Sequence, residues 1–371
     1  MTDRDALYRA ILAFPDEDTP RLAFADWFQE NGQPERADFI RAQIEFAHAE
    51  PFSPSARAAA GRAEPLLRAH RQAWGSHLPE YAEDFAFVRG FVGQVTLEAA
   101  RAPRVLADVF GNDPVQALRV VRPPGRDVWV SLEPVFEAQE LQHLTALDLP
   151  ASDLGTTYEL DALAESPHLA GLTTLGLSGN PLPPHWLTEF LAGPTLPSLT
   201  DLDLSEIPNL GPAVTQGLLQ ATHRRFRRLD LSGVMIRSND LNLAMAAECL
   251  ATVTDLRLRW GAYPTAGPLT FLDLGWVIPS ERLQVLDLDG QYLGPDGVKE
   301  LLRKPEAANL RWLGLARNGL GTAGAQLLTA TKHLDLYYLN VQENNLRPRD
   351  VEALRRRFPE AVIDAETGTV Q

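Results

Sequence analysis

The sequence contains almost no cysteine and no long apolar run. Cys249 is the only cysteine among the 371 residues, which excludes an intrachain disulfide and a zinc site built from four cysteines. No window approaches the roughly 20 apolar residues that a membrane-spanning helix needs. The first twenty residues carry five acidic side chains, so we expect neither a signal peptide nor a membrane anchor there. These absences predict a soluble, cytoplasmic protein.

Basic side chains are also scarce. Lys and Arg together number 34 against 49 Asp and Glu, which gives a formal net charge of −15. Nucleic acids and anionic membranes both attract Lys and Arg, so we expect neither as a partner. Because no lysine precedes Lys299, most of the chain cannot contain a G-x-x-x-x-G-K-[ST] phosphate loop, and none is present elsewhere.

The sequence offers few candidates for catalysis or metal binding. It has no G-x-S-x-G or H-E-x-x-H motif. His70 and His77, with Glu80 and Glu83 nearby, are spaced less tightly than the usual zinc ligands. Cys249 lies in AAECLAT, where we predict a buried structural thiol rather than a nucleophile. We therefore expect no enzymatic activity, metal or cofactor.

One short segment resembles the opening of a calcium-binding loop. It runs Asp287-Leu-Asp289-Gly290, but the glutamate that such a loop needs later is missing. We therefore assign this segment to a repeat rather than to a calcium site.

Most of the chain is a repeat of the pattern L-x-x-L-x-L. Eight clear copies are present, from LTALDL to LYYLNV, and VQALRV, which ends at Val120, is a weaker first copy. The central leucines of the eight copies are spaced by 26 to 30 residues: Leu147, Leu175, Leu202, Leu229, Leu256, Leu286, Leu313 and Leu339. Because side chains alternate along a strand, this pattern predicts one strand per repeat with its leucines facing inward.

The second half of each repeat has helical spacing. PHWLTEFLAG, TQGLLQAT and DGVKELLRK carry apolar residues three or four positions apart. We interpret LTFLDL, residues 269–274, as the helical half of the longest repeat. A single strand and helix cannot bury their apolar faces alone, so the repeats should stack into a solenoid.

The motif L-x-x-L-x-L-x-x-N-x-L resembles a leucine-rich repeat, and its length with a full helix resembles the ribonuclease-inhibitor class. Asn180, Asn318 and Asn344 hold the position where that family's asparagine bonds backbone groups of the turn. We expect looser or differently shaped turns where another residue holds this position: Ser152, Ile207, Val234, Gly261 and Gln291. The resemblance implies an α/β fold, with residues 115–371 as a right-handed solenoid. It would have a parallel sheet on its concave face, helices on its convex face, and a C-terminal capping helix and tail.

The first 50 residues do not repeat. We expect helices over Asp5–Phe14, from Thr19-Pro20 to Gly32, and from Pro34 onward. The string RLAFADWFQENGQPERADFIRAQIEFA resembles the bacterial repeat-companion domain, which implies a helical domain over residues 1–50. Residues 51–114 should be a helical linker with a first strand, and should cap the solenoid.

Four residues of this N-terminal segment are candidates for function: Asp26, Trp27, Arg36 and Arg41. We favour a structural interpretation, in which Trp27 fills the core and Asp26 pairs with one of the two arginines. The third helix should bury a stripe formed by Ala37, Ile40, Ile44 and Ala47.

The residues between the leucines should form the inner face of the sheet. We predict these partner-binding residues on it: Asp201, Asp203, Asp230, Asp255, Arg257, Arg259, Asp287, Asp289, Trp312 and Tyr338. Trp, Tyr and Arg dominate interface energies, and acidic side chains attract basic partners. The aspartates equally fit a purely solubilising role. Trp260 lies just beyond the arginines, and Arg224, Arg225, Arg227 and Arg228 should form a solvated rim.

Three functions are compatible with this pattern. The leading hypothesis is a non-enzymatic protein-interaction module that presents its concave face to a protein partner, and the acidic side chains favour a partner with a basic surface. The second is an inhibitor or neutraliser of a basic enzyme or toxin, by analogy with ribonuclease inhibitor. The third is an enzyme with its site around His70, Trp74 and His77.

Overall fold

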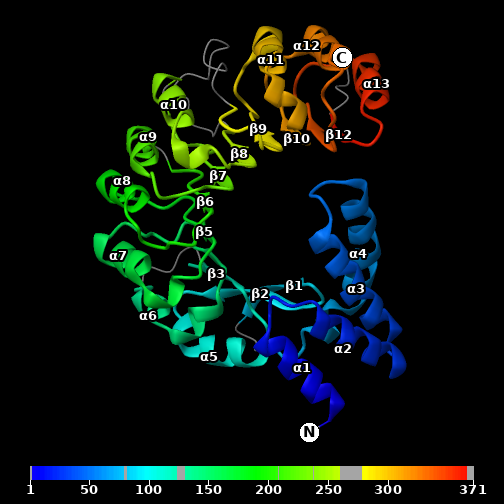
Figure 1. Cartoon of the computed structure of the whole chain (residues 1–371), viewed down its shortest axis with the longest axis vertical. Coiled ribbons are helices and arrows are strands. Elements are labelled where there is room, and N and C mark those ends of the chain that lie inside the picture. The colour runs from blue at the N-terminus through cyan, green and yellow to red at the C-terminus, as the bar shows by residue number, and fades with distance from the viewer. Residues whose placement is uncertain are drawn as a thin grey trace. The chain divides into compact units, whose positions relative to one another are not determined.

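A computed structural model of the chain describes residues 2–78, 82–122, 130–207, 209–236, 238–259 and 278–365. The chain forms two compact units (Figure 1). Unit 1 comprises Met1–Ser152 and Asp161–Leu172, and unit 2 comprises Asp153–Leu160 and Thr173–Gln371. Trp260, Gly261 and the segment 269–274, which the sequence analysis singled out, lie outside the described residues.

Unit 1 begins with four helices: α1 (Asp3–Ala13), α2 (Thr19–Glu30), α3 (Pro34–His48) and α4 (Pro54–Trp74). A proline in the first turn opens three of them, because it needs no helical hydrogen-bond acceptor there. Thr19 was expected to cap α2, but it is the first helical residue and Asp18 holds the cap position. Gly32, with φ of +79°, follows α2 and allows the turn into α3.

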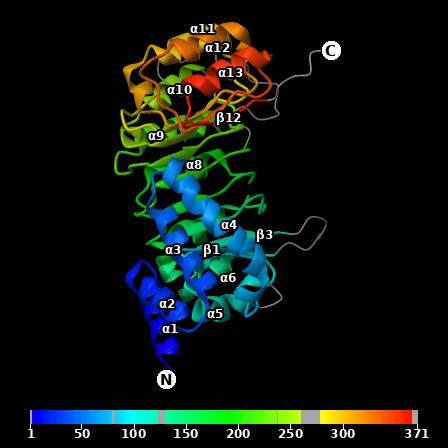
Figure 2. The same cartoon turned by 90° about the vertical axis from the view of Figure 1, so that its right-hand side faces the viewer.

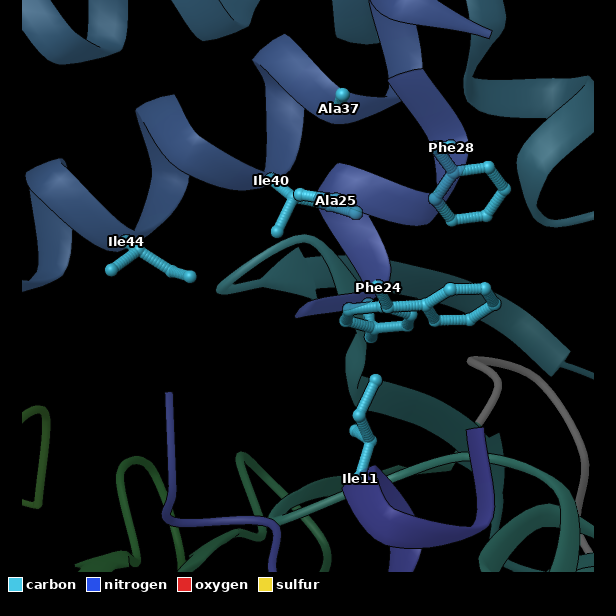
Figure 3. Packing of buried hydrophobic residues seen from close by; sticks show 8 residues of the cluster. Ile11, Phe24, Ala25, Phe28, Ala37, Ile40 and Ile44 are labelled. Atoms are coloured by element: carbon cyan, nitrogen blue, oxygen red, sulfur yellow. The ribbon is translucent and has the colours of Figure 1, made fainter. Parts of the chain in front are cut away.

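The core of these helices is a cluster of alanines, isoleucines and phenylalanines. Figure 3 shows Ile11 from α1 pointing toward the ring of Phe24 on α2, with Ile40 of α3 nearby. The rings of Phe24 and Phe28 stack with centroids 4.4 Å apart. The predicted stripe on α3 is confirmed for three of its four residues, but Ala47 is exposed because α3 extends beyond the cluster at its C-terminal end.

The rest of unit 1 contains four strands and shorter helices. β1 (Ala82–Val88) and β2 (Phe91–Glu98) form an antiparallel hairpin, of which only the second strand was predicted. β3 (Ala117–Val121) and β4 (Ala146–Asp148) continue the sheet in parallel. Further elements are α5 (Ala102–Asn112), α6 (Glu133–Phe136), and short 3-10 helices at Gln139–His143 and Pro167–Leu169. α7 (Thr157–Glu165) contributes residues to both units.

Unit 2 alternates strands with helices. Its strands are β5 (Thr174–Gly176), β6 (Asp201–Asp203), β7 (Arg228–Asp230), β8 (Asp255–Arg257), β9 (Val285–Asp287), β10 (Trp312–Gly314), β11 (Tyr338–Asn340) and β12 (Val362–Asp364). Its helices after α7 are α8 (Pro184–Ala192), α9 (Gly211–Gln220), α10 (Ser238–Met245), α11 (Gly294–Leu302), α12 (Gly321–Ala330) and α13 (Pro348–Arg357), with 3-10 helices at Glu248–Leu250 and Pro305–Asn309. Neighbouring helices such as α11, α12 and α13 lie side by side (Figure 2).

The predicted leucine register is confirmed. The strands of unit 2 pair in parallel and in chain order, so that the central leucines of neighbouring strands lie opposite each other. All eight central leucines are buried, with at most 1% of their surface exposed. Helices cover one side of these strands (Figure 1). The buried leucines belong to the core of this array. β12 was not expected, and it adds a strand where only a capping helix and a tail were predicted.

The turn asparagines connect neighbouring repeats. Asn318 donates from Nδ2 to the carbonyl of Leu288, 2.9 Å away, and accepts from the N–H of Leu293 at 3.1 Å. Asn344 donates to the carbonyl of Leu315 at 2.7 Å and accepts from the N–H groups of Asn318 and Leu320. Asn180 likewise accepts from the N–H of Leu154 in the preceding repeat at 3.1 Å, and it donates to the carbonyl of Leu177 in its own repeat at 2.9 Å. The expected role of these asparagines is therefore confirmed.

Turns that lack the asparagine are stabilised in one of two other ways. Ser152 donates to the carbonyl of Val120, and Gln291 donates to the carbonyl of Leu258. Ile207 and Val234 have no such group and are buried as apolar side chains. The same backbone position is thus stabilised by hydrogen bonds in some repeats and by burial in others.

Candidate functional site

The candidate site is the side of the unit 2 sheet that faces away from the helices, here called the open face. It consists of the residues that flank the central leucines along β6 to β11, because successive side chains on a strand point to opposite sides. All ten predicted partner-binding residues belong to unit 2 and lie on these strands or directly after them. Their role in binding stays a prediction.

Three of these residues form a continuous stack. Trp312 and Tyr338 lie opposite each other on β10 and β11, and their rings are 4.9 Å apart with planes only 8° from parallel. The guanidinium carbon of Arg257 lies 5.8 Å from the centre of the Trp312 ring. The hydroxyl of Tyr338 hydrogen-bonds Asp364 on β12. This Arg257–Trp312–Tyr338 stack is partly exposed and spans strands β8 to β11.

Gly314 makes room beside the stack. A Cβ atom there would lie 2.5 Å from Oδ1 of Asp287 and 2.9 Å from the Trp312 ring. Any side chain at this position would therefore displace the carboxylate or the ring. Gly314 was not singled out in the sequence analysis. The only signal for this requirement in the sequence is a glycine two residues after Trp312, at the last position of β10.

Four of the predicted aspartates are more buried than their open-face positions suggested. Asp201, Asp230, Asp287 and Asp289 expose only 4% to 7% of their surface. Asp287 accepts from the backbone N–H of Asp289 at 3.0 Å, and Asp289 accepts from the N–H of Ala316 at 2.7 Å. Asn340 donates to the second carboxylate oxygen of Asp289 at 2.8 Å. These bonds hold the carboxylates close against the sheet.

This burial changes the acidity of the carboxyl groups. Burial, together with the charge of Asp289, raises the pKa of Asp287 to about 6. Burial raises the pKa of Asp289 as well, and burial with the nearby charge of Asp203 raises the pKa of Asp230. Removing a carboxylate from water disfavours its charged form, and a second carboxylate nearby adds to this effect. The open face therefore carries negative charge that its own arginines neutralise only in part.

The arginines of the open face pair with carboxylates on their own and neighbouring strands. Arg257 binds Asp255 at 3.0 Å, and Arg228 lies 3.7 Å from Asp255 and 3.8 Å from Asp230. Hydrogen bonding to Asp255 and the surrounding carboxylates outweigh burial and raise the pKa of Arg257. Arg259 lies 3.9 Å from Glu206. Asp203 has no ion pair among the residues that the structure describes.

The arginine run at residues 224–228 is only partly the solvated rim that we expected. Arg225 and Arg227 pair with Glu248 and Asp201, as the interpretation allowed. Arg224 is buried instead, with 4% of its surface exposed. Its guanidinium donates to backbone carbonyls in the last turn of α8 and directly after it: Phe190, Leu191, Gly193 and Thr195. The prediction was wrong for Arg224 because the C-terminal end of α8 leaves carbonyls that need donors.

The structure also places the N-terminal candidates. Asp26 pairs with Arg41 at 2.8 Å, as predicted, and Trp27 packs partly buried against the Phe24 ring. His70 stacks on Trp74. His77 instead contacts Asp113, and the described part of the chain holds no group of three or more potential metal ligands.

Cys249 is fully buried, and burial raises the pKa of its thiol to about 11. At neutral pH it is therefore protonated, which supports the structural role predicted for it.

None of the helices within the described ranges is long and apolar enough to cross a membrane.

The stacked strand–helix repeats, the buried leucines and the turn asparagines define unit 2 as a leucine-rich-repeat solenoid. Solved structures of similar fold include the Rad7–Elc1 complex of yeast, at 12% identity, covering 98% of this chain and 93% of that chain, with a TM-score of 0.42. An internalin from Listeria monocytogenes is 12% identical and covers 74% of this chain and 87% of that chain, with a TM-score of 0.31.

The TLR13–ssRNA13 complex is also similar, at 17% identity, covering 75% of this chain and 39% of that chain, with a TM-score of 0.44. These similarities concern the fold alone. No family model and no curated protein matches the sequence.

Proposed function

We propose that the solenoid is a non-enzymatic module that binds a protein partner through its open face. The Arg257–Trp312–Tyr338 stack carries this proposal. It joins the three residue types that contribute most to protein interfaces, and it is fixed on a rigid sheet. Because the rings are already stacked in the free protein, little side-chain entropy is lost when a partner covers them.

The charges around the stack favour a partner with basic groups. Burial raises the pKa of Asp287 and Asp289, and the positive charges of the nearby arginines do not fully offset this effect. A lysine or arginine from a partner would supply further positive charge and would lower both pKa values again. Binding to such a partner should therefore weaken when these carboxyls are protonated.

Two finer assignments are part of the same proposal. The repeats belong to the ribonuclease-inhibitor-like class, and residues 1–50 form a repeat-companion domain that caps the array with residues 51–114. The sequence resemblances support both assignments. The four-helix start of unit 1 is compatible with the second. A cytoplasmic location is proposed from the sequence composition.

Affinity capture from native cell extract tests the proposed face. We expect wild-type protein to retain a partner at low salt and to lose part of it at high salt, since exposed charges are screened. The double variant Trp312→Ala/Tyr338→Ala and the charge reversal Asp203→Lys should each reduce capture by about tenfold or more. Tyr292→Ala is the control, because Tyr292 is 66% exposed and lies off the open face. Undiminished capture by both test variants would remove the open face as the binding site.

An inhibitor of a basic enzyme is the second candidate. The carboxyl groups of the open face favour this inhibitor function, because a strongly basic enzyme would be complementary to them in charge. Loss of catalytic activity in a captured enzyme, reversed by Asp203→Lys, distinguishes this candidate from a scaffold that leaves its partner active.

A further inference from the structure

Unit 1 contains a cavity of about 750 Å³ that the proposed function does not use. It lies among α1 to α4, the β1–β2 hairpin and the end of α5. Tyr8, Phe28, Arg36, Trp74, His77 and Asp113 are among its lining residues. Its size is in the range of small-molecule sites, and its walls combine aromatic rings with many polar and charged groups.

Arg36 is the unusual residue of this cavity. Only 8% of its surface is exposed, and its guanidinium lies 4.5 Å from the centre of the Trp74 ring. The rings of Phe28, Phe87 and Phe91 lie within 5.9 Å of it. Its Nη1 atom is buried and has no hydrogen-bond partner within the described ranges. Burial lowers the pKa of Arg36 to about 10, so it is still charged at neutral pH.

Among the described residues, no hydrogen bond or ion pair joins Asp113 to Arg36, although the charge of Asp113 is near enough to raise the pKa of Arg36. Other groups bind the Asp113 carboxylate directly. Asp113 is 2% exposed, and both of its oxygens lie 2.9 Å from Nε2 of His77. The hydroxyl of Tyr8 donates to the carbonyl of Asn112 at 2.8 Å and contacts Asp113 at 3.2 Å. The hydrogen bond to Asp113 raises the pKa of His77, so the carboxylate favours the protonated form of this ring. Arg36 is thus left as a buried cation with an unused donor.

We infer that this cavity is a binding site for a carboxylate attached to a flat apolar group. The guanidinium of Arg36 would bind the carboxylate, since a planar fork of N–H donors matches its two oxygens. The surrounding rings would enclose the apolar group. Arg4 and Arg9 also line the cavity, but both are exposed, and Asp5 and Asp113 offset their charge. Arg36 is therefore the buried cation that a single carboxylate would match. Free aromatic acids and the C-terminal residue of a polypeptide both offer this chemistry.

Two pairs of probes test the inference on wild-type full-length protein by calorimetry. We expect phenylacetate to bind about tenfold or more tightly than phenylacetamide, which has the same shape without the charge. N-acetylglycylphenylalanine and its C-terminal amide form the second pair. Tighter binding of this acid than of phenylacetate identifies a polypeptide C-terminus as the source, and the reverse order identifies a free acid. Equal binding of acid and amide in both pairs, or no binding of any probe at about 5 mM, overturns the inference.

A matched pair of variants on α3 tests the role of Arg36. Arg36→Gln should weaken the binding of the better acid about tenfold or more. Arg41→Gln is the control, because Arg41 lies on the same helix and bonds Asp26 and Gln29. A folded Arg36→Gln protein with wild-type affinity contradicts the inference. If Arg36→Gln does not fold, the comparison of acid with amide on wild-type protein still decides it. Binding should be unchanged in Trp312→Ala/Tyr338→Ala, which separates this site from the open face.

Discussion

Trp312 and Tyr338 lie directly opposite each other on the paired strands β10 and β11, with parallel rings 4.9 Å apart. Such a pair stabilises a sheet beyond the area that each ring buries. A double-mutant cycle with Trp312→Ala and Tyr338→Ala should give a coupling energy of about 0.5–1.5 kcal/mol in urea unfolding. Additive effects of the two substitutions would show that the rings contribute independently.

Substitution of a central leucine tests the core. Leu175→Ala and Leu313→Ala should each lower the free energy of unfolding by about 2–5 kcal/mol, because both leucines are fully buried and alanine leaves a cavity. Leu219→Ala on α9, where the side chain is 45% exposed, is the control and should cost less than about 1 kcal/mol. Losses below about 1 kcal/mol at both core positions would contradict their inward orientation.

Arg224 and Arg225 are neighbours in sequence but differ in environment. Arg224→Met should destabilise the protein by about 3 kcal/mol, because it removes the donors from several backbone carbonyls at the C-terminal end of α8 and just beyond it. Arg225→Met should change stability by about 0.5 kcal/mol, since Arg225 makes an exposed ion pair with Glu248. Thermal and urea unfolding of both variants measure the difference, and equal costs would argue against a structural role for Arg224.

Asp287 should destabilise the native state at neutral pH. Its pKa rises from 3.8 in the unfolded chain to about 6 in the folded one, so the folded state binds the proton more tightly. Stability therefore falls as the pH rises through this window. Asp287→Asn, which can still accept from the N–H of Asp289, should gain about 2–3 kcal/mol near pH 7.5 and nothing near pH 3.5. Urea unfolding at the two pH values measures this, and a loss near pH 7.5 would show that the charge is stabilising.

The His77–Asp113 pair also makes stability fall as the pH rises, but here because a favourable ion pair is lost. The hydrogen bond to Asp113 raises the pKa of His77 above 6.5, so the stabilisation is complete below pH 6.5 and is lost as the pH rises through the folded pKa. Asp113→Asn should lower the pKa of His77, as followed by the NMR shifts of its ring protons. It should also cost more stability near pH 5.5 than near pH 9. An unchanged His77 pKa would exclude Asp113 as the cause.

The sequence predicts the repeats well because one local rule governs them. An inward leucine at a constant spacing fixes both the strand and its register, and every central leucine from Leu147 to Leu339 follows it. β1 and β12 lie outside this rule. β12 has only three residues, and it forms because β11 offers an unpaired edge, which no local pattern of the sequence records.

The candidate sites are less predictable because they depend on distant neighbours. Strand register places Trp312 beside Tyr338, so that stack follows from the repeat. The burial of Asp287 depends on Gly314 of the next strand, and that of Arg224 on carbonyls one repeat earlier. The rings around Arg36 come from helices α2 to α4 and both strands of the hairpin. The spacing of residues along the chain does not predict these contacts of Asp287, Arg224 and Arg36.

The turn asparagines give the array a direction. Asn344 accepts hydrogen bonds from backbone groups of the repeat before it, and Asn318 does the same one repeat earlier. A truncation that removes Asn344 would deprive Asn318 and Leu320 of their acceptor even though both residues stay in the chain. Removal of C-terminal residues should therefore also destabilise the turn of the preceding repeat. A shortened protein should keep fewer ordered turns than its length suggests.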